Sequence, residues 1–460
     1  PDEQRRSFGP SFWLHRWMRE DPVASAQELV RGLYTAPCLA SRARLVHILF
    51  LSNYFPPEVN APATRLQEHA QQWTADGHEV TVLTSVPNFP EGEVYEGYEN
   101  ELTEEERSGV RAVRVPMYVS ANEGVLRRVL SYVSFMLSAC WYASRIRTPD
   151  VLVATSPQFF AALAGWWIAW RKDVPFVLEI RDLWPESVVA VGAMSRNVII
   201  RFFEWVERRL YRSADHIVSV TESFKEAIAE KGISRDKITV IKNGVDVDAW
   251  EQSLDNARLA QVRQDLDLQG AFVASYIGTI GMAHRADVLL EAAQYSRDPE
   301  IVFMVVGTGA RREALEKKAE KMQLANFRLV DKVPKETVPY LLALSDVSVV
   351  HLRDDPLFET VIPSKLFEAM VTGTPVVLGL RGEARDLIEG AGAGIAVPPE
   401  APDELASAVR WLKEHPELHA QMAENGYQSV RVHYDRMTLA RTYAALLGEV
   451  AAEPEAVPVA

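Results

Sequence analysis

The segment 354–376, DDPLFETVIPSKLFEAMVTGTPV, holds the strongest candidate for a binding site. Pro363 favours extended backbone, Ser364 can act as a helix cap, and a helix is expected to begin at Lys365. The N–H groups of a first helical turn attract anions such as phosphate. Glu368 lies one turn further on, where its carboxylate can accept hydrogen bonds from two ribose hydroxyls. The spacing therefore favours a nucleotide site over the alternative, a capped amphipathic helix with Glu368 in solvent.

A glycine-containing turn in 275–286, SYIGTIGMAHRA, is the second candidate. An apolar run leads into Gly278 and Gly281, and a helix is expected near Ala286. Glycines let the backbone approach a ligand, and a helix N-terminus supplies free N–H groups, which suits a diphosphate. A tight turn without a ligand is the alternative, and this stretch alone does not separate the two. For the similar loop at 307–309 we favour the tight turn.

Polar residues also follow two other apolar runs. In LEIRDLWPES (178–187), a strand is predicted to deliver Arg181 and Asp182 to its carboxyl end, where open parallel sheets bind ligands. A structural ion pair is the alternative. In SNYFPPEVNAPATR (52–65), Asn60, Thr64 and Arg65 are expected to face a cleft and contact a substrate. An ordinary proline-rich loop is equally compatible with that composition.

These residues need strands and helices to position them, and apolar runs alternate with helix-like segments along the chain. This alternation is typical of parallel β-sheets. Strands are predicted at 45–51, 79–84, 110–115, 151–154, 176–180 and 216–220, and again at 272–277, 301–306, 327–330, 347–350 and 376–378. The predicted fold is α/β, with two Rossmann-like domains facing each other across a cleft. Each domain would bind one substrate, and closure would exclude water.

The chain has 460 residues, enough for two domains. We predict an N-terminal extension at 1–44, a first domain at 45–250, a second domain at 251–432, and a final helix with a frayed tail at 433–460. The formal net charge of −14 argues against a general positive field for nucleic acid. Cys38 and Cys140 form no metal-ligand or disulfide pattern, which fits a reducing cytoplasm.

One basic segment stands out in this acidic chain: GVLRRVLSYVSFMLSACWYASRIR at 124–147 has four arginines and no acidic residue. Aromatic residues are interleaved with them. A basic, aromatic-rich helix can lie in a membrane interface, although a core helix with a basic end would look similar. The tryptophans and cations at 166–172 favour membrane contact. No apolar run reaches the ~20 residues of a spanning helix, so we predict a cytoplasmic protein peripheral to the membrane.

Together, SNYFPPEVNAPATR, EIRDLWPES, IKNGVD, SYIGTIG and PLFETVIPSKLFEAMVTGTPV resemble the family 4 retaining glycosyltransferases with the GT-B fold. They are most similar to the branch that includes N-acetylfucosamine transferases of bacterial surface-polysaccharide synthesis. The resemblance covers about residues 45–447 and implies that the last helix returns to the N-terminal domain. It also implies transfer of a hexosyl or N-acetylhexosaminyl group from a nucleotide sugar, UDP-linked in our prediction. The acceptor would be a polysaccharide or a polyprenyl-diphosphate-linked sugar at the cytoplasmic membrane face.

The resemblance assigns roles to individual residues. Glu368 would bind the ribose, Gly278 and Gly281 would lie by the pyrophosphate, and Asp182 and Arg181 would approach the transferred sugar or the acceptor. Asn60, Thr64 and Arg65 would contact the acceptor. The phosphates or the donor sugar would meet the backbone of Val361, Ile362, Pro363 and Ser364.

Three positions depart from the family pattern. The first glutamate of the usual signature pair falls on Thr360, and the usual arginine and lysine of the glycine turn fall on Thr279 and His284. A diphosphate without cationic donors is costly to desolvate, so another cation is expected. The candidates are Arg285, Lys332, Arg353 and Lys365, and we favour Lys365. No metal-binding aspartate pair stands out, so neither a metal nor a cofactor beyond the nucleotide-sugar substrate is expected.

Two other functions remain open at this point. A GT-B enzyme can epimerise a nucleotide sugar instead of transferring it. A catalytically silent module can keep the fold and bind a nucleotide sugar, and the threonine at position 360 motivates that alternative. A dinucleotide oxidoreductase is disfavoured, because no G-x-G-x-x-G pattern opens a helix after the first strand.

Overall fold

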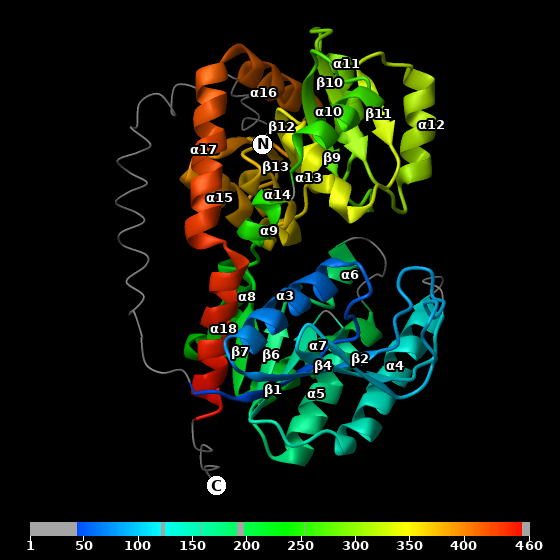
Figure 1. Ribbon diagram of the computed structural model, residues 1–460, viewed down its shortest axis with the longest axis vertical. Helices are drawn as coiled ribbons and strands as arrows, with labels where there is room; N and C mark the ends of the chain where they lie inside the picture. Colours follow the sequence, from blue (N-terminus) through cyan, green and yellow to red (C-terminus); the bar gives the residue numbers. More distant parts are fainter. Residues whose placement is uncertain (1–43, 121–124, 157, 191–196, 253, 453–460) are drawn as a thin grey trace. The chain divides into compact units, whose positions relative to one another are not determined.

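The computed structural model describes residues 44–120, 125–156, 158–190, 197–252 and 254–452 (Figure 1). The predicted N-terminal extension, apart from residue 44, lies outside the described residues, as do Cys38, residue 124 of the basic segment and the tail after 452. The chain divides into two compact units. The divisions fall after Asn243 and after Asp435, where the sequence predicted them after 250 and 432.

The first unit contains residues 44–243 and 436–452 and is built on an eight-stranded sheet of order β3-β4-β2-β1-β5-β6-β7-β8. All neighbouring strands are parallel except the hairpin of β3 and β4. The strands are β1 His47–Leu51, β2 Glu79–Ser85, β3 Thr103–Arg107, β4 Val110–Val115, β5 Val151–Ser156, β6 Phe176–Ile180, β7 His216–Ser219 and β8 Ile238–Val240. The helices are α3 Ala61–Ala75, α4 Val125–Tyr142, α5 Phe159–Lys172, α6 Glu186–Ala190, α7 Val198–Ser213, α8 Glu222–Glu230 and α18 Arg436–Val450, with 3-10 turns at Ala143–Arg145 and Arg235–Lys237.

Two helix layers cover this sheet. The connection through α3 runs from β1 to β2, in the opposite direction along the sheet from the connections through α4, α5 and α7. Right-handed crossovers therefore place α3 on one face and the other three helices on the other face. Helix α18 packs beside α3 (Figure 1). The indole N–H of Trp73 in α3 donates to the carbonyl of Ala440 in α18 at 2.7 Å. The predicted return of the last helix to the N-terminal domain is thus confirmed.

The second unit, residues 244–435, has a six-stranded parallel sheet of order β11-β10-β9-β12-β13-β14. Its strands are β9 Phe272–Ile277, β10 Ile301–Val306, β11 Phe327–Val330, β12 Val347–His351, β13 Val376–Gly379 and β14 Gly394–Val397. Its helices are α9 Val247–Glu251, α10 Asn256–Asp265, α11 Asp287–Tyr295, α12 Arg312–Met322, α13 Val338–Ala343, α14 Lys365–Val371, α15 Glu383–Ala391, α16 Pro402–Glu414 and α17 Pro416–His433, with 3-10 turns at Lys335–Thr337 and Pro356–Thr360.

The prediction of two Rossmann-like units is confirmed, and the strands that the sequence missed are short or polar. Strand β3, TEEER, is an edge strand paired only with β4, so no continuous apolar run marks it. Strand β8 has three residues, and β14 has four and begins with glycine. A continuous apolar run indicates a strand that is buried between neighbouring elements. β3, β8 and β14 lie at the edges of their sheets, where strands are less buried, so their sequences lack this mark.

Each sheet has one topological switch point, where the strand order reverses. In the first unit it lies between β1 and β5, and in the second between β9 and β12. Open α/β sheets bind ligands outside the carboxyl ends of the strands at this point. The loops after these four strands are therefore the expected positions of a binding site.

Candidate active site

In the second unit, the loop after β9 is held against the loop after β10. The backbone N–H of Gly278 donates to the carbonyl of Val306, and that of Ile280 to the carbonyl of Thr308, both at 2.9 Å. A Cβ atom added at Gly307 would lie 2.0 Å from the carbonyl oxygen of Gly278. Gly307 is therefore required by the close approach of two loops, in agreement with the structural role favoured for 307–309.

Lys365 lies against this glycine turn. Its ammonium group donates to the Tyr276 hydroxyl at 2.7 Å, and that hydroxyl donates to the carbonyl of Thr279 at 2.6 Å. A Cβ at Gly278 would lie 2.6 Å from Cε and 2.7 Å from Nζ of Lys365. Only glycine at position 278 leaves room for the lysine, so the fold brings a cation from α14 to the turn that lacks its usual arginine and lysine.

The ammonium group of Lys365 is close to losing its proton at neutral pH. Burial lowers the pKa of its ammonium group to about 7, and the carboxylate of Glu368 acts in the opposite direction. The Nζ atom also lies 3.8 Å from the centroid of the Tyr276 ring, in a cation–π contact. Burial, together with Lys365 and His351, lowers the pKa of His284 to about 4. At neutral pH His284 is uncharged, so an arriving anion would find Lys365 as the group able to gain a proton.

His351 fixes the geometry of this turn from the end of β12. Its Nε2 accepts the backbone N–H of Glu400 at 2.9 Å, so its Nδ1 carries the proton and donates to the carbonyl of His284 at 3.1 Å. Neither His351 nor Tyr276 was predicted from the sequence. His351 directly follows a predicted strand, which is a usable signal, whereas Tyr276 lies inside a strand and has no such mark.

The other predicted donor-site residues have varied surroundings. Gly281 lies beside the His284 ring, since a Cβ there would be 3.0 Å from Nδ1. Ser364 makes no side-chain capping hydrogen bond and has helical dihedrals, so its expected capping role was wrong. The Thr360 hydroxyl donates to the carbonyl of Leu357 at 2.6 Å. Ile362 is buried, while Val361, Pro363, Ser364 and Glu368 are half-buried.

The rival cations are less well placed than Lys365. Arg285 lies 3.5 Å from a carboxylate oxygen of Asp287 and 4.0 Å from one of Glu400. Lys332 is exposed after β11. Arg353 contacts the turn through its backbone N–H, which donates to the carbonyl of Ala283 at 2.8 Å. Gly278, Gly281, His284 and Lys365 thus form one cluster, with Glu368 close enough to influence the Lys365 charge.

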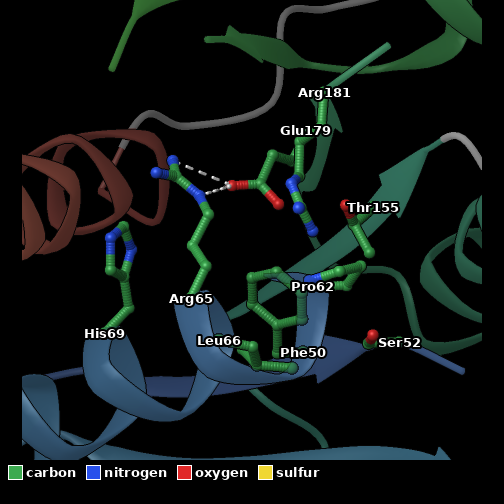
Figure 2. A pocket seen from close by; sticks show the side chains of 9 residues that line it. All are labelled: Phe50, Ser52, Pro62, Arg65, Leu66, His69, Thr155, Glu179 and Arg181. Atoms are coloured by element: carbon green, nitrogen blue, oxygen red, sulfur yellow. Dashed lines mark hydrogen bonds and ion pairs between the residues drawn. The ribbon is translucent and has the colours of Figure 1, made fainter. Parts of the chain in front are cut away.

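In the first unit, a pocket opens at the switch point between β1 and β5 (Figure 2). Its residues come from the carboxyl ends of β1, β5 and β6, from the segments that follow them, and from the first half of α3. They are Phe50, Ser52, Pro62, Arg65, Leu66, His69, Thr155, Glu179 and Arg181. Two of the predicted site residues, Arg65 and Arg181, therefore line the same pocket.

Arg65 is 4% exposed and is held by several partners. Its guanidinium donates from Nε and from Nη2 to one Glu179 oxygen, each at 3.3 Å, and from Nη1 to the side-chain oxygen of Asn243 at 3.0 Å (Figure 2). Glu179 is itself 3% exposed. This buried pair ties α3 to β6 and to the segment after β8, so the structure gives Arg65 a stabilising role. Its contact with an acceptor stays a prediction.

Arg181 differs from Arg65, because its Nε has no hydrogen-bond partner among the described residues. Burial lowers the pKa of Arg181 to about 10, opposed by Glu179, so the group remains charged at neutral pH. Burial raises the pKa of the neighbouring Asp182 carboxyl, although hydrogen bonds from Ser187 and Leu183 act against this shift. Arg181 is therefore a cation available to a ligand oxygen in this pocket.

The last two predicted residues lie at the start of α3. Asn60 caps this helix, because its Oδ1 accepts the backbone N–H of Ala63 at 2.9 Å. Its side-chain amide nitrogen has no hydrogen-bond partner among the described residues. Thr64 is half-buried one turn further on. Asn60 thus has a structural role as the cap of α3, and its contact with a substrate stays a prediction.

The described residues hold no cluster of three or more His, Cys, Asp or Glu side chains that could bind a metal ion. In the same part of the chain, none of the helices is long and apolar enough to span a bilayer. The expected independence from metals and cofactors stays a prediction.

Comparisons with known proteins agree with the geometry. Residues 60–244 match the family described as "Glycosyl transferase 4-like domain", and residues 261–429 match "Glycosyl transferases group 1". The first match begins after β1 and takes in the other seven strands of the first sheet, and the second covers all six strands of the second sheet with the loops at its switch point. The fold and these two matches define a GT-B glycosyltransferase, and the matches together support a member of the family 4 glycosyltransferases.

Individual relatives support the same assignment. WcaI of Escherichia coli K12, whose name assigns it to colanic acid biosynthesis, is 25% identical over 389 residues, 82% of this chain and 95% of its own. The solved structure of HepE from Anabaena in complex with UDP-glucose has a TM-score of 0.66 at 18% identity, covering 88% of this chain and all of that chain. WaaG, a glycosyltransferase of lipopolysaccharide biosynthesis, has a TM-score of 0.60 at 17% identity, covering 87% and 99%. The two solved structures share the fold of this chain, and WcaI resembles it over most of both sequences.

Proposed function

We propose that this protein is a retaining glycosyltransferase that moves a sugar from a UDP-linked donor to a lipid-linked or polysaccharide acceptor in bacterial surface-glycan synthesis. The observation that carries the proposal is the contact of Lys365 with the Gly278 turn at a switch point. This contact supplies a cation beside the backbone N–H groups that would bind a diphosphate. The UDP-glucose complex of HepE supports the choice of uridine. The branch of the family and the identity of the sugar are part of the proposal.

The chain's residues would act mainly by positioning and electrostatics. The Gly278–Gly281 backbone and Lys365 hold the diphosphate, the Val361–Ser364 backbone lies along the phosphates or the donor sugar, and Glu368 accepts hydrogen bonds from the ribose. As the anomeric C–O bond breaks, charge on the leaving diphosphate is stabilised by Lys365 and backbone N–H groups. The acceptor hydroxyl attacks from the face that the diphosphate leaves, and its proton passes to a diphosphate oxygen, which gives retention. Arg181 and Asp182 would orient the sugar or the acceptor.

A thermal-shift screen against UDP-, GDP-, ADP- and dTDP-sugars tests the donor, because a ligand at 100 times its Kd stabilises the folded state by about 2.7 kcal/mol. We expect a UDP-sugar to stabilise the protein and Glu368→Ala to remove that effect. Stabilisation of wild type and variant to the same extent would contradict the ribose assignment. Incubating the donor with and without a lipid acceptor separates transfer from epimerisation. Slow donor hydrolysis argues against a silent binding module.

We further propose that the first unit docks on the cytoplasmic membrane face through one layer of helices. Most of the large apolar side chains exposed on the described residues lie on α4, α5 and α7, which pack against one another in that order. We call them the aromatic surface: Leu130, Leu137, Trp141, Trp166, Trp167, Trp170, Val198, Ile199, Phe202 and Trp205. Several are strongly exposed to solvent: Trp141 is 75% exposed and Trp170 is 69% exposed.

Basic side chains accompany the aromatic surface although the whole chain carries a net charge of −14. Arg127 and Arg128 are exposed on α4, Arg171 lies over the Trp167 ring and Arg209 over the Trp205 ring. Tryptophans flanked by arginines suit the level of lipid headgroups, and the arginines suit anionic lipids. The predicted membrane contact of the segment 124–147 is thereby extended to α7, for which no membrane contact was predicted from the sequence.

Flotation with phosphatidylglycerol vesicles tests this surface, with phosphatidylcholine vesicles for comparison. We expect binding to the anionic vesicles at low salt and a marked loss with Trp170→Glu. The matched control is Tyr295→Glu, because Tyr295 is 57% exposed on the other unit. Wild-type protein that stays unbound at low salt, or equal loss in both variants, would refute the docking surface.

A further inference from the structure

A second pocket in the first unit lies where the loops after β1 and β2 meet α4. Asn53 and Tyr54 come from the first loop, Asn88 and Phe89 from the second, and Arg128 and Tyr132 from the helix. Strands β1 and β2 are parallel neighbours, so both loops leave the carboxyl edge of the sheet. None of these residues lines the Arg65 pocket. We call this second cavity the polar pocket.

One buried polar atom in the polar pocket has no partner. Asn53 is 2% exposed and lines the pocket, yet its Oδ1 accepts no hydrogen bond from any described residue. A buried acceptor without a donor is costly, so native proteins normally satisfy it with water or a ligand. The space is narrow and admits a group about the size of a water molecule. A single hydroxyl fits there and can donate to Asn53.

The wall of the polar pocket is built before any ligand arrives. Glu58 is 2% exposed, and its Oε1 accepts the backbone N–H groups of Asn88 at 2.9 Å and Phe89 at 3.0 Å. The Asn88 amide nitrogen donates to the carbonyl of Val86 at 2.8 Å. These bonds hold the second loop in one conformation, so the polar pocket does not need to be assembled by its ligand.

Hydroxyl groups and a cation complete the polar pocket. Tyr54 and Tyr132 both line the pocket, and burial raises the pKa of Tyr54, so its hydroxyl stays protonated. The Tyr54 ring meets the Phe89 ring edge-on with centroids 5.3 Å apart. Arg128 is exposed at the pocket and its helix carries no acidic residue. The polar pocket thus offers acceptors and hydroxyls inside and a positive charge at its mouth.

We propose that the polar pocket is an acceptor subsite, which takes one hydroxyl of a sugar while Arg128 pairs with the phosphate attached to that sugar. This inference rests on the proposed transfer to a lipid-linked acceptor. It agrees with the position of α4, because the helix that supplies Arg128 and Tyr132 also carries Leu137 and Trp141 of the aromatic surface. A sugar phosphate anchored in a bilayer would present its phosphate at that level.

The test measures binding of sugar 1-phosphates of glucose, galactose, mannose and N-acetylglucosamine by calorimetry, with saturating UDP present to occupy the donor site. We expect at least one to bind the wild type and Arg128→Gln to weaken it about tenfold or more. Arg127→Gln is the matched control, because Arg127 is also exposed on α4 but does not line the polar pocket. If both variants weaken sugar 1-phosphate binding equally, the effect comes from the general positive charge of α4, and the subsite is overturned.

A second variant separates sugar from phosphate. Tyr132→Phe removes one hydroxyl and keeps the ring, so we expect a several-fold loss for the sugar 1-phosphate and no change for inorganic phosphate. No binding of any sugar 1-phosphate to the wild type, or equal losses for both probes, would overturn the inference. UDP-glucose stabilisation is measured on every variant. If the donor binds and Arg128→Gln has no effect, the subsite fails alone, whereas failure of donor binding in the wild type overturns the proposed function.

Discussion

Donor binding should take up a proton at Lys365. In the free protein, burial holds the pKa of Lys365 at about 7, so close to half of the molecules carry a neutral lysine at neutral pH. A diphosphate beside the ammonium group favours the charged form and raises that pKa. Binding should therefore weaken as pH rises through 7, and Lys365→Met should bind more weakly with no such pH dependence.

The magnitude follows from the fraction of charged lysine. With a free-state pKa of about 7, that fraction falls from about 0.9 at pH 6 to about 0.03 at pH 8.5, so the apparent Kd should rise about 30-fold, or about 2 kcal/mol. Two other groups near Lys365 do not titrate in this range. His284 has a pKa of about 4, and burial raises the pKa of Tyr276 above its usual value. Two charges 4 Å apart at an effective dielectric of 20 attract by about 4 kcal/mol, enough to hold the lysine protonated in the complex.

Calorimetric titration with UDP-glucose, or with the sugar found in the thermal-shift screen, gives the measurement. Nucleotide sugars suit it better than UDP, because their diphosphate has no proton to lose near neutral pH. Repeating the titration in buffers of different ionisation enthalpy counts the protons taken up, and we expect about half a proton at pH 7 and nearly one at pH 8.5. A pH-independent Kd for the wild type would refute this reasoning, as would an equal slope in Lys365→Met.

Three further predictions concern stability. Gly307→Ala should lower the melting temperature and weaken donor binding, because its Cβ would lie 2.0 Å from the Gly278 carbonyl oxygen. The control Gly390→Ala has no atom near its Cβ and should be neutral or stabilising. Equal effects of the two substitutions would contradict the close approach of the two loops. Arg65→Met leaves Glu179 buried and unpaired and should cost about 3–5 kcal/mol in urea unfolding, against less than about 1 kcal/mol for Arg385→Met at an exposed pair. Burial raises the pKa of Glu58 from 4.5 to about 7, so its stabilising contribution is complete below pH 4.5 and is lost as pH rises through 7. Relative to the wild type, the free energy of unfolding of Glu58→Gln should therefore rise by up to about 3 kcal/mol between pH 5 and 8. A difference in stability that stays constant with pH would contradict the raised pKa.

Much of the fold could be read from local patterns. The continuous apolar runs at 272–277 and 301–306 became β9 and β10 with the predicted bounds. Buried parallel strands must be apolar on both faces, so the pattern survives in any single sequence. Helix α14 begins at Lys365 as predicted, although without the Ser364 cap, because Ser364 adopts helical dihedrals and its side chain makes no capping bond.

Contacts between distant segments could not be read in this way. Lys365 and Tyr276 are 89 residues apart and meet only because β9 and β12 are neighbours at the switch point. The sequence could name four candidate cations but offered no distance to choose among them. Arg65 and Glu179, separated by 114 residues, are a similar case. A loop arginine looks the same in sequence whether it faces a ligand or a buried carboxylate.

By itself, the sequence determined the class of fold, the order of the strands along the chain and the positions of the glycine-containing turns, since these depend on burial patterns and backbone freedom within a few residues. Tertiary structure alone decided that Lys365 reaches the Gly278 turn and that Arg65 is held in an ion pair. It also decided that the unpartnered side-chain oxygen of Asn53 lies in the same pocket as Arg128. Charge and hydrogen bonding act over a few ångströms in space, and chain separation carries no information about that distance.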